Sequence, residues 1–407
     1  MQSYMVIEII NQQERIMIAI KEKKKCCGCA ACATICPYHV LTMKADKSGF
    51  LYPIVNNKKR CTNCGLCEKV CPILHENENR TPTCSYAIKN NNEDVRKRSS
   101  SGGVFSAFAK RTIEEGGIVY GASFDEQWNV KHIGITKKED LHYLQGSKYV
   151  QSNTFGIYKD IKQELQEGVN VLFTGTPCQV AGLKHYLQKE YQNLMTIDLI
   201  CHGVPSPKIW KDYLSEVINQ YKQPIVKIDF RNKVSGWKNF HFVINFADSA
   251  VENNQTADIV CHHQDNLYMR LFLDNYILRP SCYSCMFRKG KSGSNYTLGD
   301  YWGIHNVNAE FDDDRGISLL LEYDKPRSIP SHIKQHCIVI ETSVESALKG
   351  NPAFTRDWPQ NRYSKLFFFL HNNLSINIRS CHSICLKIQN ASRRLSSILR
   401  KLDPRRI

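Results

Sequence analysis

The sequence has no apolar run long enough to cross a membrane. A transmembrane helix needs about 18 consecutive apolar residues, and the 407-residue chain contains no such run. The first 25 residues hold short apolar pieces, but Glu8, Glu14 and Arg15 interrupt them, so they do not have the pattern of a secretory signal either. We therefore expect a cytoplasmic protein without a transmembrane segment.

Two further absences narrow the possibilities. The chain contains no G-x-G-x-x-G fingerprint, which argues against a Rossmann-type dinucleotide site. It also has no low-complexity segment, and its hydrophobic content of 42% and charged content of 23% are typical of a globular protein. Because 407 residues are too many for one core, we expect two to three domains.

Acidic residues are scarce at the C-terminal end, where residues 360–407 carry ten Lys or Arg and a single acid. A helix over residues 392–402 would be basic and amphipathic, with four apolar residues on one face: Leu395, Ile398, Leu399 and Leu402. Such a helix could make a peripheral contact with an anionic membrane or an acidic partner, or it could pack on its own protein. No nucleic-acid-binding module accompanies it, so we expect no nucleic-acid partner.

Cysteine is abundant, and eight of the 18 cysteines form two similar runs. Each run has the spacing C-x2-C-x2-C-x3-C followed by proline, which is the pattern of bacterial ferredoxins with two 4Fe-4S clusters. In that pattern the fourth cysteine of each run serves the other cluster. We therefore assign one cluster to Cys26, Cys29, Cys32 and Cys71, and the second cluster to Cys61, Cys64, Cys67 and Cys36.

Zinc is the alternative metal for these runs, but zinc sites usually draw their ligands from two C-x2-C pairs. Cys27 falls outside the pattern and is interpreted as a spare thiol. Two neighbouring clusters would form a path for single electrons. The absence of a secretory signal also favours a reducing compartment over a framework of disulfides.

The predicted fold is a multidomain protein of the α+β and α/β classes. A bacterial-type ferredoxin domain with a hairpin insert comes first, and an α/β domain with partly parallel strands follows, because strands and helices alternate after residue 96. The expected boundaries are an N-terminal extension at 1–25, the two-cluster domain at 26–74, a linker at 75–95, the α/β domain at 96–350 and a basic helical tail at 351–407.

Four cysteines of the larger domain form a second candidate metal site: Cys178, Cys201, Cys282 and Cys285. Cys178 opens a helix after a predicted strand, and Cys201 ends the next strand, so both should lie at the carboxyl edge of the sheet where ligands gather. Four thiolates would suit a third 4Fe-4S cluster or a zinc ion. Unrelated buried cysteines beside a turn would give the same sequence.

Two segments of small and polar residues could bind a cofactor. Ser99, Ser100, Ser101, Gly102 and Gly103 precede a predicted helix, where backbone N–H groups and hydroxyls could hold a phosphate, although a plain serine N-cap is the alternative. The second segment supplies Lys148 for an anionic group and Tyr149 for a ring, with Gly146 and Ser147 before them. An ordinary surface turn would explain this segment equally well.

Six segments, in this order along the chain, resemble the coenzyme F-420 hydrogenase/dehydrogenase beta-subunit family, in its bacterial branch with an N-terminal two-cluster ferredoxin domain. They are Ser99–Ser106, Gly146–Ser152, Gly175–Gln179, Asp198–Ser206, Arg279–Cys285 and Gly299–Gly303. With the cysteine runs, the resemblance covers roughly residues 26–350.

The resemblance implies an oxidoreductase subunit in which FAD exchanges electrons with iron–sulfur clusters and passes a hydride to or from a deazaflavin or another two-electron substrate. It implies a third 4Fe-4S cluster at the second cysteine set, and FAD contacts at the two small-residue segments. His202 could donate a proton near the flavin, although a structural histidine is the alternative. The partner would be a redox protein or a small two-electron substrate; a non-catalytic relay subunit and a cluster- or zinc-stabilised interaction module are the alternative functions.

Overall fold

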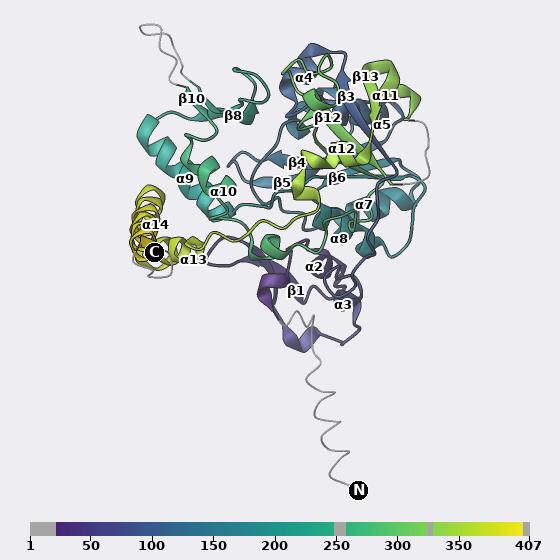
Figure 1. Ribbon diagram of the computed structural model, residues 1–407. Helices are drawn as coiled ribbons and strands as arrows, with labels where there is room; N and C mark the ends of the chain where they lie inside the picture. Colours follow the sequence, from purple (N-terminus) through teal and green to yellow (C-terminus); the bar gives the residue numbers. More distant parts are fainter. Residues whose placement is uncertain (1–21, 248–257, 324–328, 402–407) are drawn as a thin grey trace, which may run out of the picture.

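The computed structural model describes residues 22–247, 258–323 and 329–401, and Figure 1 shows the arrangement of their helices and strands. Almost all of the predicted N-terminal extension lies outside the described residues. The side chains of the predicted apolar face of the C-terminal helix, from residue 395 onward, also lie outside them. Within the described part, no helix has both the length and the apolar character that crossing a membrane requires.

The cysteine-rich unit contains two short α-helices and a hairpin. Its elements are η1 (Lys23–Lys25), α2 (Ala31–Ile35), β1 (Leu41–Ala45), β2 (Leu51–Val55), η2 (Lys58–Arg60) and α3 (Leu66–Lys69). Strands β1 and β2 pair antiparallel with Leu41 opposite Val55. The Asp46 carboxylate closes the turn by accepting hydrogen bonds from the backbone of Ser48 and Phe50. The predicted hairpin is therefore confirmed.

An eight-stranded mixed sheet forms the centre of the larger unit, in the order β13-β3-β12-β11-β7-β6-β4-β5. Its middle strands β11, β7, β6 and β4 run parallel, whereas the outer pairings are antiparallel. The strands are β3 (Cys84–Asn90), β4 (Ile118–Phe124), β5 (Val130–Ile135), β6 (Val171–Gly175), β7 (Leu194–Leu199), β11 (Tyr296–Asp300), β12 (Ser318–Glu322) and β13 (Cys337–Thr342).

Helices cover both faces of this sheet (Figure 1). On one face α5 (Val104–Glu114) and α11 (Ser331–His336) share a core with Leu172 and Leu320. On the other face α7 (Ile157–Gln166) and α8 (Pro177–Leu187) pack around Phe173. This second core also contains Cys29 and Val70, so the ferredoxin-like unit is packed against the same helices. The short helices α4 (Glu93–Arg98), α6 (Leu141–Leu144) and α12 (Val344–Lys349) and the turns η3 (Lys138–Asp140), η5 (Ile304–Asn306) and η6 (Pro352–Phe354) complete this part.

A third layer is built on a three-stranded antiparallel sheet in the order β10-β9-β8. Its elements are β8 (Ile225–Asn232), β9 (His241–Phe246), β10 (Ile259–His262), α9 (Pro207–Tyr221), α10 (Leu267–Leu273), α13 (Ser364–Leu374) and α14 (Ile378–Lys401). Ile378, Cys381 and Cys385 of α14 are fully buried in the same core as Ile209 of α9. The first turns of the C-terminal helix therefore pack on the protein itself.

The predicted linker over residues 75–95 was wrong in its second half. β3 occupies Cys84–Asn90 and pairs with both β12 and β13, inside the large sheet. Its polar residues concealed the strand in the sequence, because each of them has a partner only in the folded chain. The Ser85 hydroxyl donates to the Thr342 carbonyl at 2.8 Å, and Lys89 pairs with Asp313 at 3.2 Å. The short strands β10 and β11 also went unpredicted.

Candidate functional site

The structure brings together the four cysteines assigned to the first cluster. Cys26, Cys29, Cys32 and Cys71 all line one small pocket, with Pro72 and Met43 in its wall. Burial raises the pKa of Cys32 and of Cys71, and the neighbouring Cys26 thiol raises both further. The neighbouring Cys27 thiol lowers the pKa of Cys29, but burial and the charges of Cys32 and Cys71 outweigh it and raise that pKa. In this environment the free cysteines favour the protonated thiol. Bound iron would favour the thiolate form instead.

The backbone around these cysteines is held by contacts with the larger unit. Cys29 faces helix α8, where a Cβ atom added to Gly182 would lie 2.7 Å from the Cβ of Cys29. The Thr154 hydroxyl donates to the Cys29 carbonyl at 2.9 Å. The close approach therefore depends on a glycine at this point of α8.

The second cysteine set lies nearer the surface. Cys36 ends α2 and accepts a hydrogen bond from the backbone N–H of Val40 at 3.4 Å, and Cys67 lies on α3. Cys61 is half-buried and Cys64 is exposed. The assignment of these four thiols to one cluster stays a prediction.

The third set converges from three places in the fold. Cys178 is the second residue of α8, whose start is fixed by a capping box between Thr176 and Gln179. Cys201 follows β7, while Cys282 lies in η4 (Pro280–Ser284) and Cys285 directly after it. Burial, and after it the charges of the other members, raise the pKa of Cys201, of Cys282 to about 12, and of Cys285 to about 11.

All six pairs within this third set interact electrostatically. Cys201 and Cys285 also line a second small pocket, together with Pro177 and Arg288. Within the described ranges, no three His, Cys, Asp or Glu side chains are arranged to hold a single metal ion. The four thiols are thus neighbours, and neither a zinc ion nor a third cluster is shown by this arrangement alone.

Cys27 connects the first and third sets. Its buried thiol lies beside Cys178 on one side and beside Cys29 on the other, and all three belong to one packed core. The sequence pattern gave Cys27 no role because it lies outside the ferredoxin spacing. The only hint in the sequence was that Cys26 is followed directly by a second cysteine. The fold was needed to relate Cys27 to Cys178, which lies 151 residues further along the chain.

A buried arginine joins the two units at the same place. Arg279 donates to the carbonyls of Cys26 at 2.8 Å and Leu51 at 2.9 Å, and to Gln151 Oε1 at 2.9 Å. Its guanidinium also lies 4.2 Å from the ring centre of Tyr52. A planar fork with five donors suits several carbonyl partners at once. Arg279 therefore fixes the first cysteine run relative to the third set.

The two predicted cofactor segments meet in the structure. The hydroxyls of Ser100 and Ser147 are 2.8 Å apart, and the Ser147 N–H donates to Ser100 Oγ at 2.7 Å. Ser101 donates to the Ile317 carbonyl at 2.7 Å. A Cβ atom on Gly102 would lie 2.1 Å from the Ile88 carbonyl oxygen, so only glycine fits between this loop and β3.

Lys148 does not extend from its segment toward a ligand. Its ammonium donates to the carbonyls of Tyr143 at 2.8 Å, Gln145 at 2.9 Å and Gly146 at 3.3 Å. Burial lowers the pKa of Lys148 to about 7. Because an ammonium has three donors, Lys148 uses all of them to close its own loop, and its contact with a cofactor stays a prediction.

Arg231 on β8 is a residue that the sequence analysis missed. Its Nη1 atom donates to the Tyr149 hydroxyl at 3.3 Å and to the Asp300 carboxylate at 2.9 Å. Its Nε and Nη2 atoms are buried and have no hydrogen-bond partner among the described residues. Buried donors are normally satisfied, so these two N–H groups could serve an electron-rich group of a ligand, while the guanidinium itself lies 4.1 Å from the ring centre of Phe240. A single arginine in a strand gave no signal in the sequence.

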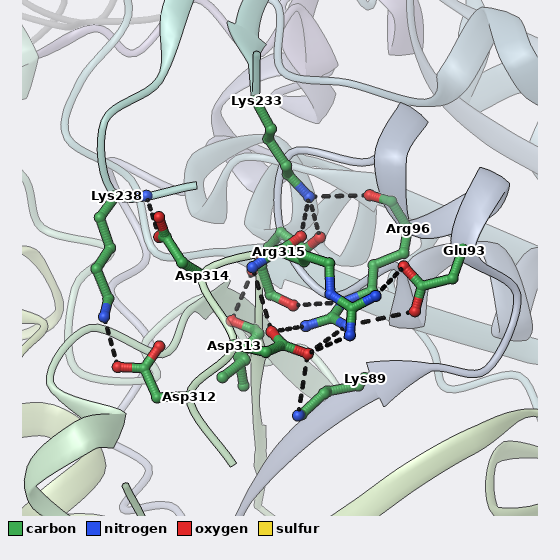
Figure 2. Close-up of polar contacts among 12 residues, drawn as sticks. Lys89, Glu93, Arg96, Lys233, Lys238, Asp312, Asp313, Asp314 and Arg315 are labelled. Atoms are coloured by element: carbon green, nitrogen blue, oxygen red, sulfur yellow. Dashed lines mark hydrogen bonds and ion pairs between the residues drawn. The ribbon is translucent and has the colours of Figure 1, made fainter. Parts of the chain in front are cut away.

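A charged network holds the serine–glycine loop (Figure 2). Lys233 donates to the carbonyls of Arg96 at 2.9 Å, Ser101 at 2.7 Å and Arg315 at 2.9 Å. Asp313 lies between Arg96, Lys89 and Arg315 in Figure 2, and its shortest hydrogen bonds are those it accepts from the Arg96 guanidinium nitrogens. Burial raises the pKa of Asp313, but the hydrogen bonds and charges of Arg96 outweigh burial and hold the pKa well below its usual range.

His202 lies in an aromatic setting beside the third set. Its Nε2 atom is 2.8 Å from Asn275 Oδ1, and its ring packs at 4.8 Å from Trp358 and 4.9 Å from Phe272. Burial lowers the pKa of His202. These contacts are those of a structural histidine, and a proton-donor role stays a prediction.

Comparison with known families adds the identity of both units. Residues 25–73 match the 4Fe-4S dicluster domain. Residues 85–159 match the N-terminal domain of the coenzyme F420 hydrogenase/dehydrogenase beta subunit, and residues 168–322 match its C-terminal domain. The two beta-subunit matches together span more than half of the chain. The chain belongs to the coenzyme F420 hydrogenase/dehydrogenase beta-subunit family.

This beta-subunit family member is therefore an iron–sulfur electron-transfer subunit of the oxidoreductase type, and the resemblance seen in its sequence is confirmed. Among solved structures, it matches a chain of the F420-reducing [NiFe] hydrogenase complex from Methanosarcina barkeri, studied by xenon derivatization. The match has 15% identity and a TM-score of 0.41, and it covers 70% of this chain and 97% of that chain. No curated protein matches the sequence.

Proposed function

We propose that this chain is an iron–sulfur flavoprotein oxidoreductase. Electrons would pass between the two clusters of the ferredoxin unit, a third 4Fe-4S cluster on Cys178, Cys201, Cys282 and Cys285, and FAD. The two-electron substrate would be a deazaflavin or a molecule of similar chemistry. The observation that carries the proposal is the position of Cys27, whose thiol contacts both Cys29 and Cys178 and so sets the first and third ligand sets side by side.

The third set supports a redox centre rather than a structural zinc site. Four thiolates suit either one, but this set lies beside a predicted cluster and is separated from it by a single buried thiol. A redox-inactive ion there would end the electron path at the ferredoxin unit. Arg288 stands next to the set and donates to the Cys201 carbonyl at 2.9 Å, so a positive charge is available near the added negative charge of a thiolate-bound cluster.

The flavin assignment is supported by the meeting of the two loop segments and by the free donors of Arg231. The two segments would supply small hydrogen-bonding groups from Ser100, from Ser147 and from the glycines within each segment. Arg231 would donate from Nε and Nη2 to an anionic or carbonyl oxygen. Asp300 and Tyr149 hold the guanidinium in place. When bound, a flavin exchanges a hydride with an organic substrate and single electrons with iron–sulfur clusters.

One observation favours a second candidate function, a non-catalytic relay subunit. The Lys148 ammonium is fully occupied by its own loop, which removes one of the predicted contacts for a phosphate. In that case the chain would carry electrons without turning over a substrate by itself.

The flavin assignment is tested by measuring FAD binding to the anaerobically purified protein. We expect about one FAD per chain in the parent protein, and at least a ten-fold weaker affinity in Arg231→Met, since two buried donors are lost. Arg362→Met removes an exposed arginine two residues before α13 and serves as the matched control. Both variants should keep their iron. A parent protein that binds iron and takes up electrons but binds no flavin would establish the relay function instead.

A further inference from the structure

The loop that carries the second cysteine set lies on an exposed and strongly basic surface. Residues 56–60 and 62–65 are exposed, and Cys64 is among them. A Cβ atom on Gly65 would meet no other atom within 4 Å, so the loop faces open space. A cluster held by this loop would therefore lie at the surface of the molecule. In Figure 1 the unit lies at the lower end of the molecule, below α7 and α8.

Positive charge is concentrated around this loop. Residues 37–69 carry six Lys or Arg and two acids. Lys58, Lys59 and Arg60 form one exposed turn, η2, directly before Cys61. No ion pair links these three cations to an acid within the described ranges, so their charge is available to a partner. Asp46, one of the two acids, pairs with Lys23 at 3.0 Å.

An exposed aromatic side chain stands beside the basic turn. Tyr38 is 42% exposed and follows Cys36 by two residues. The Asn56 N–H donates to the Val40 carbonyl at 2.9 Å, which places the chain just before Val40 next to the chain just after Asn56. Tyr38 and Lys58 therefore lie on adjacent stretches of chain, and an exposed aromatic residue and the basic turn are both close to the second cysteine set.

We propose that this surface, made of Tyr38, Lys58, Lys59, Arg60 and the Cys64 loop, docks a small acidic protein that carries one electron. The inference rests on the proposed electron path, in which the second cluster is the outer end. Charge of one sign around a redox centre speeds encounter with a partner of the opposite sign. Electron-transfer contacts are small and transient, which fits one turn, one ring and one loop. A membrane or a nucleic acid would gain nothing from the position of the basic turn beside a cluster.

The test uses a reduced plant-type 2Fe-2S ferredoxin, an acidic protein, as the electron donor in anaerobic stopped-flow measurements on the whole chain. The charge-reversed variant is Lys58→Glu/Lys59→Glu/Arg60→Glu. The matched control is Lys211→Glu/Lys227→Glu/Lys365→Glu, which makes the same charge change at exposed residues of α9, β8 and α13. At low ionic strength we expect the variant to react at least about ten-fold more slowly than the parent, and the control within about two-fold of it. The parent rate should fall steeply with added salt, whereas the variant rate should not.

Three results would overturn the inference. Equal slowing of the variant and the control would show that only net charge matters. A parent rate that ignores salt would remove the electrostatic contact. Loss of binding to phosphatidylglycerol vesicles or to duplex DNA in the variant, with unchanged ferredoxin rates, would assign the surface to that other ligand. Uptake of electrons from dithionite separates the two proposals, because failure there contradicts the proposed function, whereas normal uptake with no reaction with ferredoxin contradicts the docking surface alone.

Discussion

Arg279 reaches from the loop of the third cysteine set into the ferredoxin unit, where its Nε atom donates to the carbonyl oxygen of Cys26 at 2.8 Å. The same side chain is fully buried and lies three residues before Cys282. One residue thus fixes a member of the first ligand set relative to a member of the third. The relative position of the two sets is part of the folded core and is not left to a flexible linker.

Arg279→Lys should therefore destabilise the protein although it keeps the charge. A lysine cannot reproduce the planar fork that reaches Cys26, Leu51 and Gln151. We expect the free energy of unfolding to fall by about 3 kcal/mol, because buried carbonyls lose their donors. Denaturant unfolding of the anaerobic protein measures this, with the exposed Arg362→Lys as the control. A variant as stable as the parent would show that Arg279 does not hold the units together.

Gly182→Ala tests the packing of α8 against the first cysteine run. In most helix interiors this change stabilises by about 1 kcal/mol. Here the added methyl carbon would lie 2.7 Å from Cys29 Cβ and 3.0 Å from Cys29 Sγ. We expect a loss of at least about 1 kcal/mol through overpacking, together with a lower iron content. The sign of the change in the free energy of unfolding decides the test. A stabilised variant would mean that α8 and the first cysteine run are not in contact.

Asp313→Asn tests the charged network that holds the serine–glycine loop. The pKa of Asp313 in the folded protein lies below its ordinary value of 3.8, so its contribution is present above about pH 4 and is lost as the pH falls further. Between pH 5 and 8 we expect a constant destabilisation of about 3 kcal/mol, since Arg96, 2% exposed, loses its main counter-charge. Below pH 4 the difference from the parent should shrink. The exposed Asp160→Asn is the control, and a difference that grew on acidification would contradict this assignment.

Cys27→Ser tests the link between the first and third sets. Because Cys27 lies outside the ferredoxin spacing, we expect the variant to keep its iron and its absorbance spectrum. The contact with Cys178 and Cys29 is altered, however, so the magnetic interaction between reduced clusters, seen by electron paramagnetic resonance, should change. Cys261→Ser, on β10, is the comparison. If Cys27→Ser lost iron, Cys27 would be a ligand and the predicted spacing would need revision.

The local patterns of this chain could be predicted from its sequence, because they depend on neighbours along the chain. The hairpin around Asp46, the helix that begins at Pro177 and the parallel middle strands all follow from turn residues, capping and apolar periodicity. Strand β3 could not be predicted, since Ser85 and Lys89 are satisfied only by Thr342 and Asp313, more than 200 residues away.

The same limit applies to the candidate site. The cysteine spacing identified the ferredoxin unit, which the family comparison confirms. The two loop segments predicted to bind a cofactor lie side by side in the fold, and their contact with FAD stays a prediction. Cys27, Arg231 and Arg279 act through contacts with residues distant in the sequence, so spacing alone gave no reason to choose them. Lys148 is the opposite case. The sequence suggested it as a cofactor contact, but its ammonium forms its hydrogen bonds within its own loop.

The most direct test of the whole account is the iron and FAD content of the anaerobically reconstituted protein and of Cys201→Ser, with Cys337→Ser, a buried cysteine of β13, as the control. We predict about twelve iron atoms in the parent and the control, in three 4Fe-4S clusters, and one FAD in each. Cys201→Ser should hold about eight iron atoms, since the third cluster loses a ligand. Eight iron atoms in all three proteins would contradict the third cluster and, with it, the proposed electron path to the flavin.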